Sequence, residues 1–160
     1  MKNISFILKV SIFLLMYSCG NNVNTPDNIN TKASLPDSFK FNPAGLKVIT
    51  TFINKEHGTM STLFGNSLAQ QKAMAVNEKM MVGELFTLVT WKQQPDAHWF
   101  GANIPGDLQS VEVIQTTSAG ETLAINYQLY AGKYLVLHAD TLGKSERIKS
   151  ILDLKPSIMP

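Results

Sequence analysis

The residues best equipped for chemistry gather between positions 90 and 105. This stretch holds both tryptophans, Trp91 and Trp99, together with His98 and Phe100. A histidine beside aromatic walls can donate a hydrogen bond, move a proton or act as an axial ligand of haem iron. Lys92 follows Trp91 and is either a cation in the same pocket or a surface lysine lying on its aliphatic stem. The sequence therefore predicts a ligand pocket lined by Trp91, Lys92, His98, Trp99 and Phe100.

The same side chains also have a purely structural explanation. Trp91, Trp99 and Phe100 could fill a core, since aromatic side chains carry large apolar areas wherever they lie. His98 could be half-buried and bonded to a backbone carbonyl. Either way, residues 90–105 connect two predicted strands, because an apolar run (85–89) precedes them and an alternating run (108–114) follows.

Other catalytic and metal-binding patterns are absent from the sequence. His57, His98 and His138 lie about 40 residues apart, without the short paired spacings of structural zinc sites. There is no Gly-rich phosphate loop and no Gly-x-Ser-x-Gly motif. We therefore expect no metal site, and the sequence favours no catalytic class.

The first 18 residues have the pattern of a secretory signal peptide. Lys2 and Lys9 give a positive start, and residues 10–17 form an apolar run shorter than the roughly 20 residues that cross a bilayer. Cys19, the only cysteine, stands at the expected cleavage point, and residues 15–19 (Leu-Met-Tyr-Ser-Cys) resemble a bacterial lipobox. We therefore expect Cys19 to be lipidated, with acyl chains such as palmitate anchoring the protein. The alternative is a plain signal peptide with a chance cysteine.

The residues after Cys19 predict where the anchored protein resides. Position 20 is glycine rather than aspartate, and no acidic cluster follows. By lipoprotein sorting logic, we expect attachment to the outer membrane, facing the periplasm. An acylated Cys19 leaves no disulfide for the mature chain, so burial alone must hold its core in an oxidising compartment.

The charge balance excludes one class of partner. The whole chain has a net charge of +2, but removal of Lys2 and Lys9 with the signal leaves 12 basic and 12 acidic residues. A neutral chain without a stripe of Lys and Arg lacks the electrostatic pattern of nucleic-acid binding. We therefore expect no nucleic-acid partner.

Composition and periodicity divide the chain into a tether and one domain. Residues 19–36 are rich in Asn, Thr, Asp and Pro and predict a flexible tether, followed by a domain over 37–160. Asn66 is a good N-cap for a helix to about residue 79. Residues 134–137 fit a short strand or a helical turn. The predicted strands cover 47–54, 59–65, 84–93, 111–116 and 123–130, and a second helix covers 145–154. This pattern indicates an α+β domain, an antiparallel sheet of about five strands with two helices.

Four short stretches resemble the cytochrome P-460 family. Residues 59–66 are similar to its strand that closes on Gly-Asn before the first helix, and residues 84–92 to its strand ending in aliphatic-x-Trp-Lys. Residues 99–105 and 158–160 resemble the Bacteroidetes lipoprotein branch of that family. The similarity covers about residues 46–160. It implies an antiparallel sheet with helices on one face, often a homodimer, and a haem pocket for hydroxylamine or nitric oxide chemistry.

The sequence departs from this family where the haem should be attached. The cytochromes use Cys-x-x-Cys-His near the C-terminus, whereas residues 152–158 here read Leu-Asp-Leu-Lys-Pro-Ser-Ile. We therefore expect no covalent haem, and a module that binds a small molecule or a protein partner. Two alternatives stay open: a non-covalent haem protein with His98 as axial ligand, acting on hydroxylamine or nitric oxide, and an envelope scaffold without a ligand.

Overall fold

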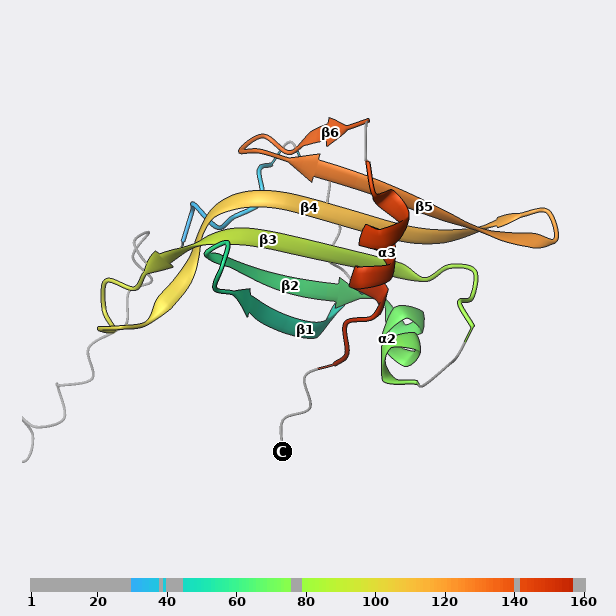
Figure 1. Ribbon diagram of the computed structural model, residues 1–160, viewed down its shortest axis with the longest axis horizontal. Coiled ribbons are helices and arrows are strands. Elements are labelled where there is room, and N and C mark those ends of the chain that lie inside the picture. The colour runs from blue at the N-terminus through green and yellow to red at the C-terminus, as the bar shows by residue number, and fades with distance from the viewer. Residues whose placement is uncertain (1–29, 38, 40–44, 76–78, 140–141, 157–160) are drawn as a thin grey trace, which may run out of the picture. The chain divides into compact units, whose positions relative to one another are not determined.

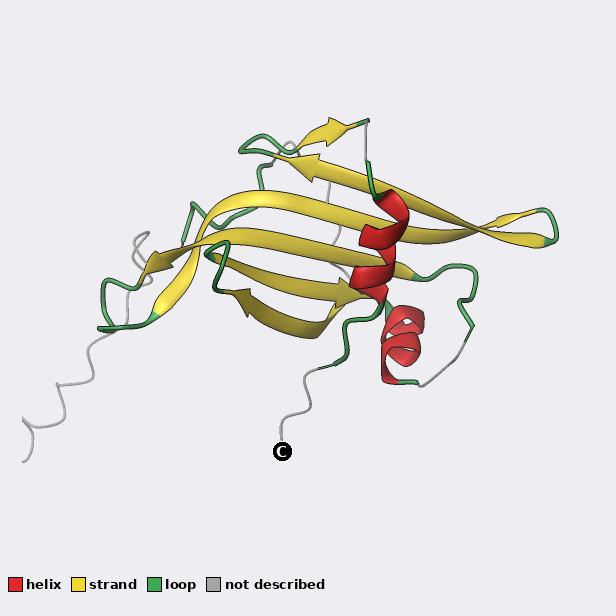
Figure 2. Ribbon diagram, viewed as in Figure 1, coloured by secondary structure: helices red, strands yellow, loops and turns green. Residues whose placement is uncertain are grey.

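Six antiparallel strands form one sheet in the computed structural model, and their order in the sheet follows their order in the chain (Figures 1 and 2). The structure describes residues 30–37, 39, 45–75, 79–139 and 142–156. The strands are β1 (Lys47–Asn54), β2 (Thr59–Gly65), β3 (Leu85–Pro95), β4 (Asn103–Ala119), β5 (Thr122–Ala131) and β6 (Val136–His138), and the helices are α2 (Ser67–Met74) and α3 (Lys144–Leu152). The predicted α+β class with an antiparallel sheet is confirmed. The sixth strand, β6, falls where the sequence allowed either a strand or a helical turn.

The helices pack on one face of the sheet, named here the helix face. Alternate residues of a strand point to opposite faces, and Leu88 of β3 points to the helix face. It joins a core with Ile114 from β4 and Ile151 from α3. In Figure 1, α3 crosses in front of β3 and β4. The near-continuous apolar run of β3 predicted burial on both faces, and this is confirmed, because Phe86, Leu88 and Val89 are all buried.

The opposite face, named the strap face, has its own smaller core. Val89, Leu108 and Val111 are buried there. The covering chain comes from residues 31–37, named the strap, whose Leu35 packs against this core. Phe39 follows and meets the Tyr130 ring edge-on, with a centroid separation of 4.9 Å. The compact unit therefore begins at Thr31, and the tether predicted to reach residue 36 ends earlier.

Helix α2 begins as predicted but ends early. The Asn66 side chain accepts a hydrogen bond from the Ala69 N–H at 3.0 Å, which is the N-cap arrangement. The prediction of a helix to residue 79 is wrong, because Ala75 is already extended. The chain has to return to β4, where the Thr116 hydroxyl donates to the Met81 carbonyl at 2.6 Å. Met81 and Thr116 lie 35 positions apart, so local periodicity could not predict this contact.

The two strands around residues 90–105 are longer than predicted. Residues 91–95 and 103–105 belong to β3 and β4, and only residues 96–102 form the connecting turn. Prolines argue against a central strand because they lack an N–H donor. Here Pro105 pairs with Gln93 beyond an irregularity in the β3–β4 register, which accommodates it. Among the described residues, no helix is long and apolar enough to cross a membrane.

Candidate functional site

The structure separates the residues of the predicted pocket. Trp91 points to the strap face, where it packs against the smaller core. Lys92, the next residue of β3, is exposed and lies opposite Thr59 of β2. Because adjacent strand residues point to opposite faces, Trp91 and Lys92 do not line one cavity.

The other three predicted residues lie in the turn between β3 and β4, named here the aromatic tip (residues 96–102). Trp99 is 72% exposed and Phe100 is fully exposed. The side chain of His98 is 89% exposed, and its Nδ1 lies 3.5 Å from Asp96 Oδ1. The interpretation that Trp99 and Phe100 fill a core is wrong. For Trp91 it is partly right, since that ring is half-buried.

Trp91 instead fastens the strap to the sheet. Its Nε1–H donates to the Ala33 carbonyl at 2.8 Å, across 58 residues of sequence. Leu35 packs on the same core two residues later. An indole N–H that lies in a partly buried position usually finds such a partner. The strap therefore has both a polar and an apolar attachment.

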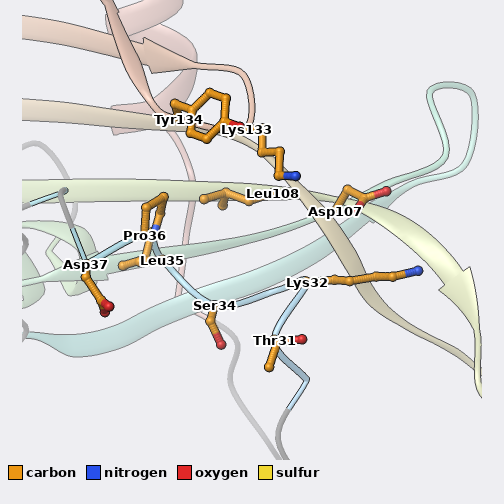
Figure 3. Close-up of a pocket in the computed structure, with 10 residues that line it drawn as sticks. All are labelled: Thr31, Lys32, Ser34, Leu35, Pro36, Asp37, Asp107, Leu108, Lys133 and Tyr134. Carbon is orange, nitrogen blue, oxygen red and sulfur yellow. The ribbon is translucent and has the colours of Figure 1, made fainter.

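A groove of about 750 Å³ lies between the strap and the sheet (Figure 3). We name it the strap groove. Its apolar part is formed by Leu35, Pro36 and Leu108, which occupy the middle of the view in Figure 3. Tyr134 stands over it, and the Lys133 Nζ is 5.8 Å from the Tyr134 ring centroid. The remaining lining residues are polar: Thr31, Lys32, Ser34, Asp37, Asp107 and Lys133.

A second, smaller groove lies on the other side of Trp91, with a volume of about 470 Å³. Its lining residues come from β1, β2, β3 and β4. Its lining is Thr51, Phe52, Ile53, Met60, Ser61, Thr62, Trp91 and Pro105. Neither of these two grooves includes His98, Trp99 or Phe100. Of the five predicted residues, only Trp91 therefore lines a cavity described here.

The surroundings of His98 do not fit a haem. An axial ligand of an enclosed haem needs apolar walls over the macrocycle, whereas this imidazole projects from an exposed turn. The other histidines, His57 and His138, are also exposed. In the described ranges, no group of three or more His, Cys, Asp or Glu could hold a metal ion. Cys19 and residues 158–160 lie outside those ranges.

A charged cluster lies between α3 and the sheet. Glu112 is 4% exposed and accepts hydrogen bonds from Arg147 and from the Tyr127 hydroxyl. Burial, and then the hydrogen bond to Glu112, raise the pKa of Tyr127 well above its ordinary value of 10. The hydrogen bond to Glu112 also raises the pKa of Arg147. The cluster attaches the helix to the sheet and lines neither groove.

Sequence reasoning missed the strap groove because its walls come from distant parts of the chain. The composition of residues 31–36 predicted a tether and not a wall of a groove. Tyr134 lies in a stretch without clear periodicity. One signal was present. Leu35, Pro36 and Phe39 are apolar residues at the end of a polar segment, which is typical of chain that packs on a domain.

Comparison with known proteins gives no assignment. The chain matches no protein-family model, and no curated protein shows significant similarity to it. The relation to the cytochrome P-460 family stays a prediction that depends on the four short stretches described above.

Proposed function

We propose that the protein is a lipid-anchored envelope protein that binds a small molecule in the strap groove and carries no covalent haem. Lipidation at Cys19 and an outer-membrane position facing the periplasm are parts of this proposal and derive from the sequence. The proposed role is capture of a ligand rather than its conversion.

One observation carries the binding role. The strap groove combines apolar and polar lining residues, and its volume of about 750 Å³ falls in the range of about 300–1,000 Å³ that is usual for ligand sites. The strap that forms one wall is held by the Trp91–Ala33 hydrogen bond. A wall held in place before binding reduces the ordering that a ligand has to induce.

The lining indicates the chemical class of the ligand. Leu35, Pro36 and Leu108 favour an apolar body such as a ring or short chain. Two lysines and two aspartates among the lining residues, Lys32, Lys133, Asp37 and Asp107, favour polar substituents without a large net charge. A small amphipathic molecule satisfies both requirements.

The test uses anilinonaphthalene sulfonate, a fluorescent probe with an apolar body and one polar group. The full chain should enhance its fluorescence with saturable binding. Tyr134→Ala should weaken probe affinity about tenfold, which corresponds to about 1.4 kcal/mol, because Tyr134 stands over the groove. The matched control is Leu142→Ala, which removes another exposed apolar side chain that does not line the groove.

Three outcomes distinguish the possibilities. Selective weakening by Tyr134→Ala supports the strap groove. If Ile53→Ser weakens binding and Tyr134→Ala does not, the ligand occupies the smaller groove beside Trp91, since Ile53 lines that groove. If neither variant changes binding, the proposed site is refuted, and a scaffold without a ligand is favoured.

We further propose that the domain is a haem-free relative of the cytochrome P-460 proteins. The antiparallel sheet with helices on one face is compatible with the fold that the resemblance implies. The alternative of non-covalent haem at His98 has no supporting observation, because that ring is exposed. An absorption spectrum of the chain after incubation with haem tests both: a flat visible spectrum supports the proposal, whereas a Soret band lost in His98→Ala contradicts it.

A further inference from the structure

The aromatic tip presents two large apolar side chains that no described part of the chain covers. Trp99 is 72% exposed, and Phe100 is fully exposed. The turn that carries them is internally bonded. The Asp96 N–H donates to the Ala102 carbonyl at 2.9 Å, and the Ala102 N–H donates to the Trp99 carbonyl at 3.0 Å. Gly101 adopts a φ of +80°, which other residues rarely adopt. The fold therefore holds both rings outward in a defined turn.

The aromatic tip carries little outward charge. Residues 93–104 contain no Lys, Arg or Glu, and Asp96 is their one acidic residue. The Asp96 side chain is only 15% exposed, and its Oδ1 accepts a hydrogen bond from the His98 backbone N–H at 2.8 Å. Insertion of Trp99 and Phe100 into an apolar phase would therefore not remove water from an outward-facing carboxylate. Removing water from a charged group has a large free-energy cost.

The β4–β5 hairpin, at the opposite end of the sheet, has no aromatic residue in its turn. The β4–β5 turn consists of Ala119, Gly120, Glu121 and their neighbours Ser118 and Thr122, without a large apolar side chain. Figure 1 shows the β3–β4 and β4–β5 hairpins at opposite ends of the sheet. The β3–β4 turn therefore differs from the β4–β5 turn in its two exposed aromatic rings. Tyr134, in the turn between β5 and β6, is also exposed.

The N-terminal strap joins the sheet near the aromatic end. Ala33 is bonded to Trp91, eight residues before Trp99 on the strand that leads into the tip. At about 3.3 Å per residue this separation is at most about 26 Å. Cys19 lies 12 residues before Thr31, and a chain of that length spans at most about 40 Å. A lipid on Cys19 could therefore lie in the same bilayer that the aromatic tip touches.

We propose that the aromatic tip is a second membrane contact, which inserts Trp99 and Phe100 into the headgroup region of the bilayer that holds the Cys19 lipid. This inference rests on the lipid anchor of the proposed function. Tryptophan concentrates at membrane interfaces, where its ring meets the apolar phase and its N–H meets water. Two contacts, one covalent lipid and one aromatic turn, would orient the domain on the membrane.

The experiment uses the mature, full-length protein reconstituted into vesicles of phosphatidylethanolamine and phosphatidylglycerol whose acyl chains are partly brominated. Bromine quenches tryptophan only within the bilayer. We expect strong quenching in the parent protein, which is lost in Trp99→Phe while the half-buried Trp91 remains. The matched control adds Glu121→Trp to Trp99→Phe, which moves the exposed indole to the opposite end of the sheet, and it should stay unquenched.

Each outcome decides the proposal. Flotation with the vesicles and a mass that includes acyl chains on Cys19 establish the anchor independently of the tip. An anchored protein whose Trp99 is unquenched refutes the membrane contact and leaves the anchor intact. A mass without acyl chains refutes the anchor, and the second contact with it. Unquenched emission from Trp99 that changes with protein concentration would mean that the tip contacts another copy of the chain, which also refutes the proposal.

Discussion

The carboxylate of Glu112 on β4 is held by the guanidinium of Arg147 on α3 through two hydrogen bonds. Nε donates to Oε2 at 2.8 Å, and Nη2 donates to Oε1 at 2.6 Å. The two residues lie 35 positions apart, and the pair joins the last helix to the middle of the sheet. Glu112 is 4% exposed, whereas Arg147 is 48% exposed. Glu112 is therefore a buried negative charge under the helix, and Arg147 reaches it from the solvent side.

Replacing Arg147 with methionine should destabilise the fold by about 2–3 kcal/mol. Removing one partner of a fully buried pair costs roughly 3–5 kcal/mol because the other charge is left unsatisfied, and the exposure of Arg147 reduces this value. Urea denaturation measures the difference. Lys149→Met, on the same helix but exposed, is the control and should change the free energy of unfolding by less than about 0.5 kcal/mol. Equal effects of the two variants would mean that the ion pair does not hold α3.

Stability should fall in alkaline solution because of Tyr127. Its pKa is raised in the folded state above the ordinary value of 10, so the folded protein retains a proton that the unfolded chain releases. The resulting stabilisation is fully present below pH 10 and is lost as the pH rises through the folded-state pKa. Urea midpoints measured from neutral to strongly alkaline pH should therefore fall less steeply in Tyr127→Phe than in the parent. Tyr134→Phe should follow the parent, because that side chain is exposed; if it behaves like Tyr127→Phe, the assignment to Tyr127 is wrong.

Gly65→Ala should destabilise the protein by about 1–3 kcal/mol, as overpacking does. A Cβ at Gly65 would lie 2.6 Å from Ile49 Cδ1 and 2.8 Å from Ala69 Cβ. The loss of stability would therefore come from the lack of space between β2, β1 and α2. Ile49→Val removes the Cδ1 atom. In a double-mutant cycle, Ile49→Val should therefore offset part of the effect of Gly65→Ala, with a coupling above about 0.5 kcal/mol. Strict additivity would exclude the steric explanation.

Asn66→Ala should destabilise the protein by about 2 kcal/mol, more than the roughly 1 kcal/mol of an ordinary N-cap. Its Oδ1 accepts from the Ala69 N–H, and its Nδ2 donates to the Gly83 carbonyl at 2.7 Å. Asn66→Asp keeps the acceptor and loses the donor, so thermal denaturation should place it between the parent and the alanine variant. Ser67→Ala, at the exposed next position, serves as the control. If Asn66→Asp were as stable as the parent, the contact with Gly83 would contribute nothing.

The sequence by itself determined the elements whose causes are local. The β-branched residues of β1, the alternation along β2 and β5, and the N-cap at Asn66 depend on residues within a few positions of one another. These predictions were confirmed, and β1 and β2 have the predicted bounds. The lipobox that ends at Cys19 is also a local motif, and the lipidation and the membrane location inferred from it stay predictions.

Only the tertiary structure decided where the aromatic residues go. Alternation tells which residues share a face but not which chain segment covers that face. Residues 31–37 cover Trp91, and nothing in the described ranges covers Trp99 and Phe100, although all three rings come from one short stretch. The contacts that decide this outcome, Trp91 with Ala33 and Glu112 with Arg147, join residues 58 and 35 positions apart. Periodicity carries no information across such separations, so the fold had to bring these residues together before the strap groove and the aromatic tip could be distinguished.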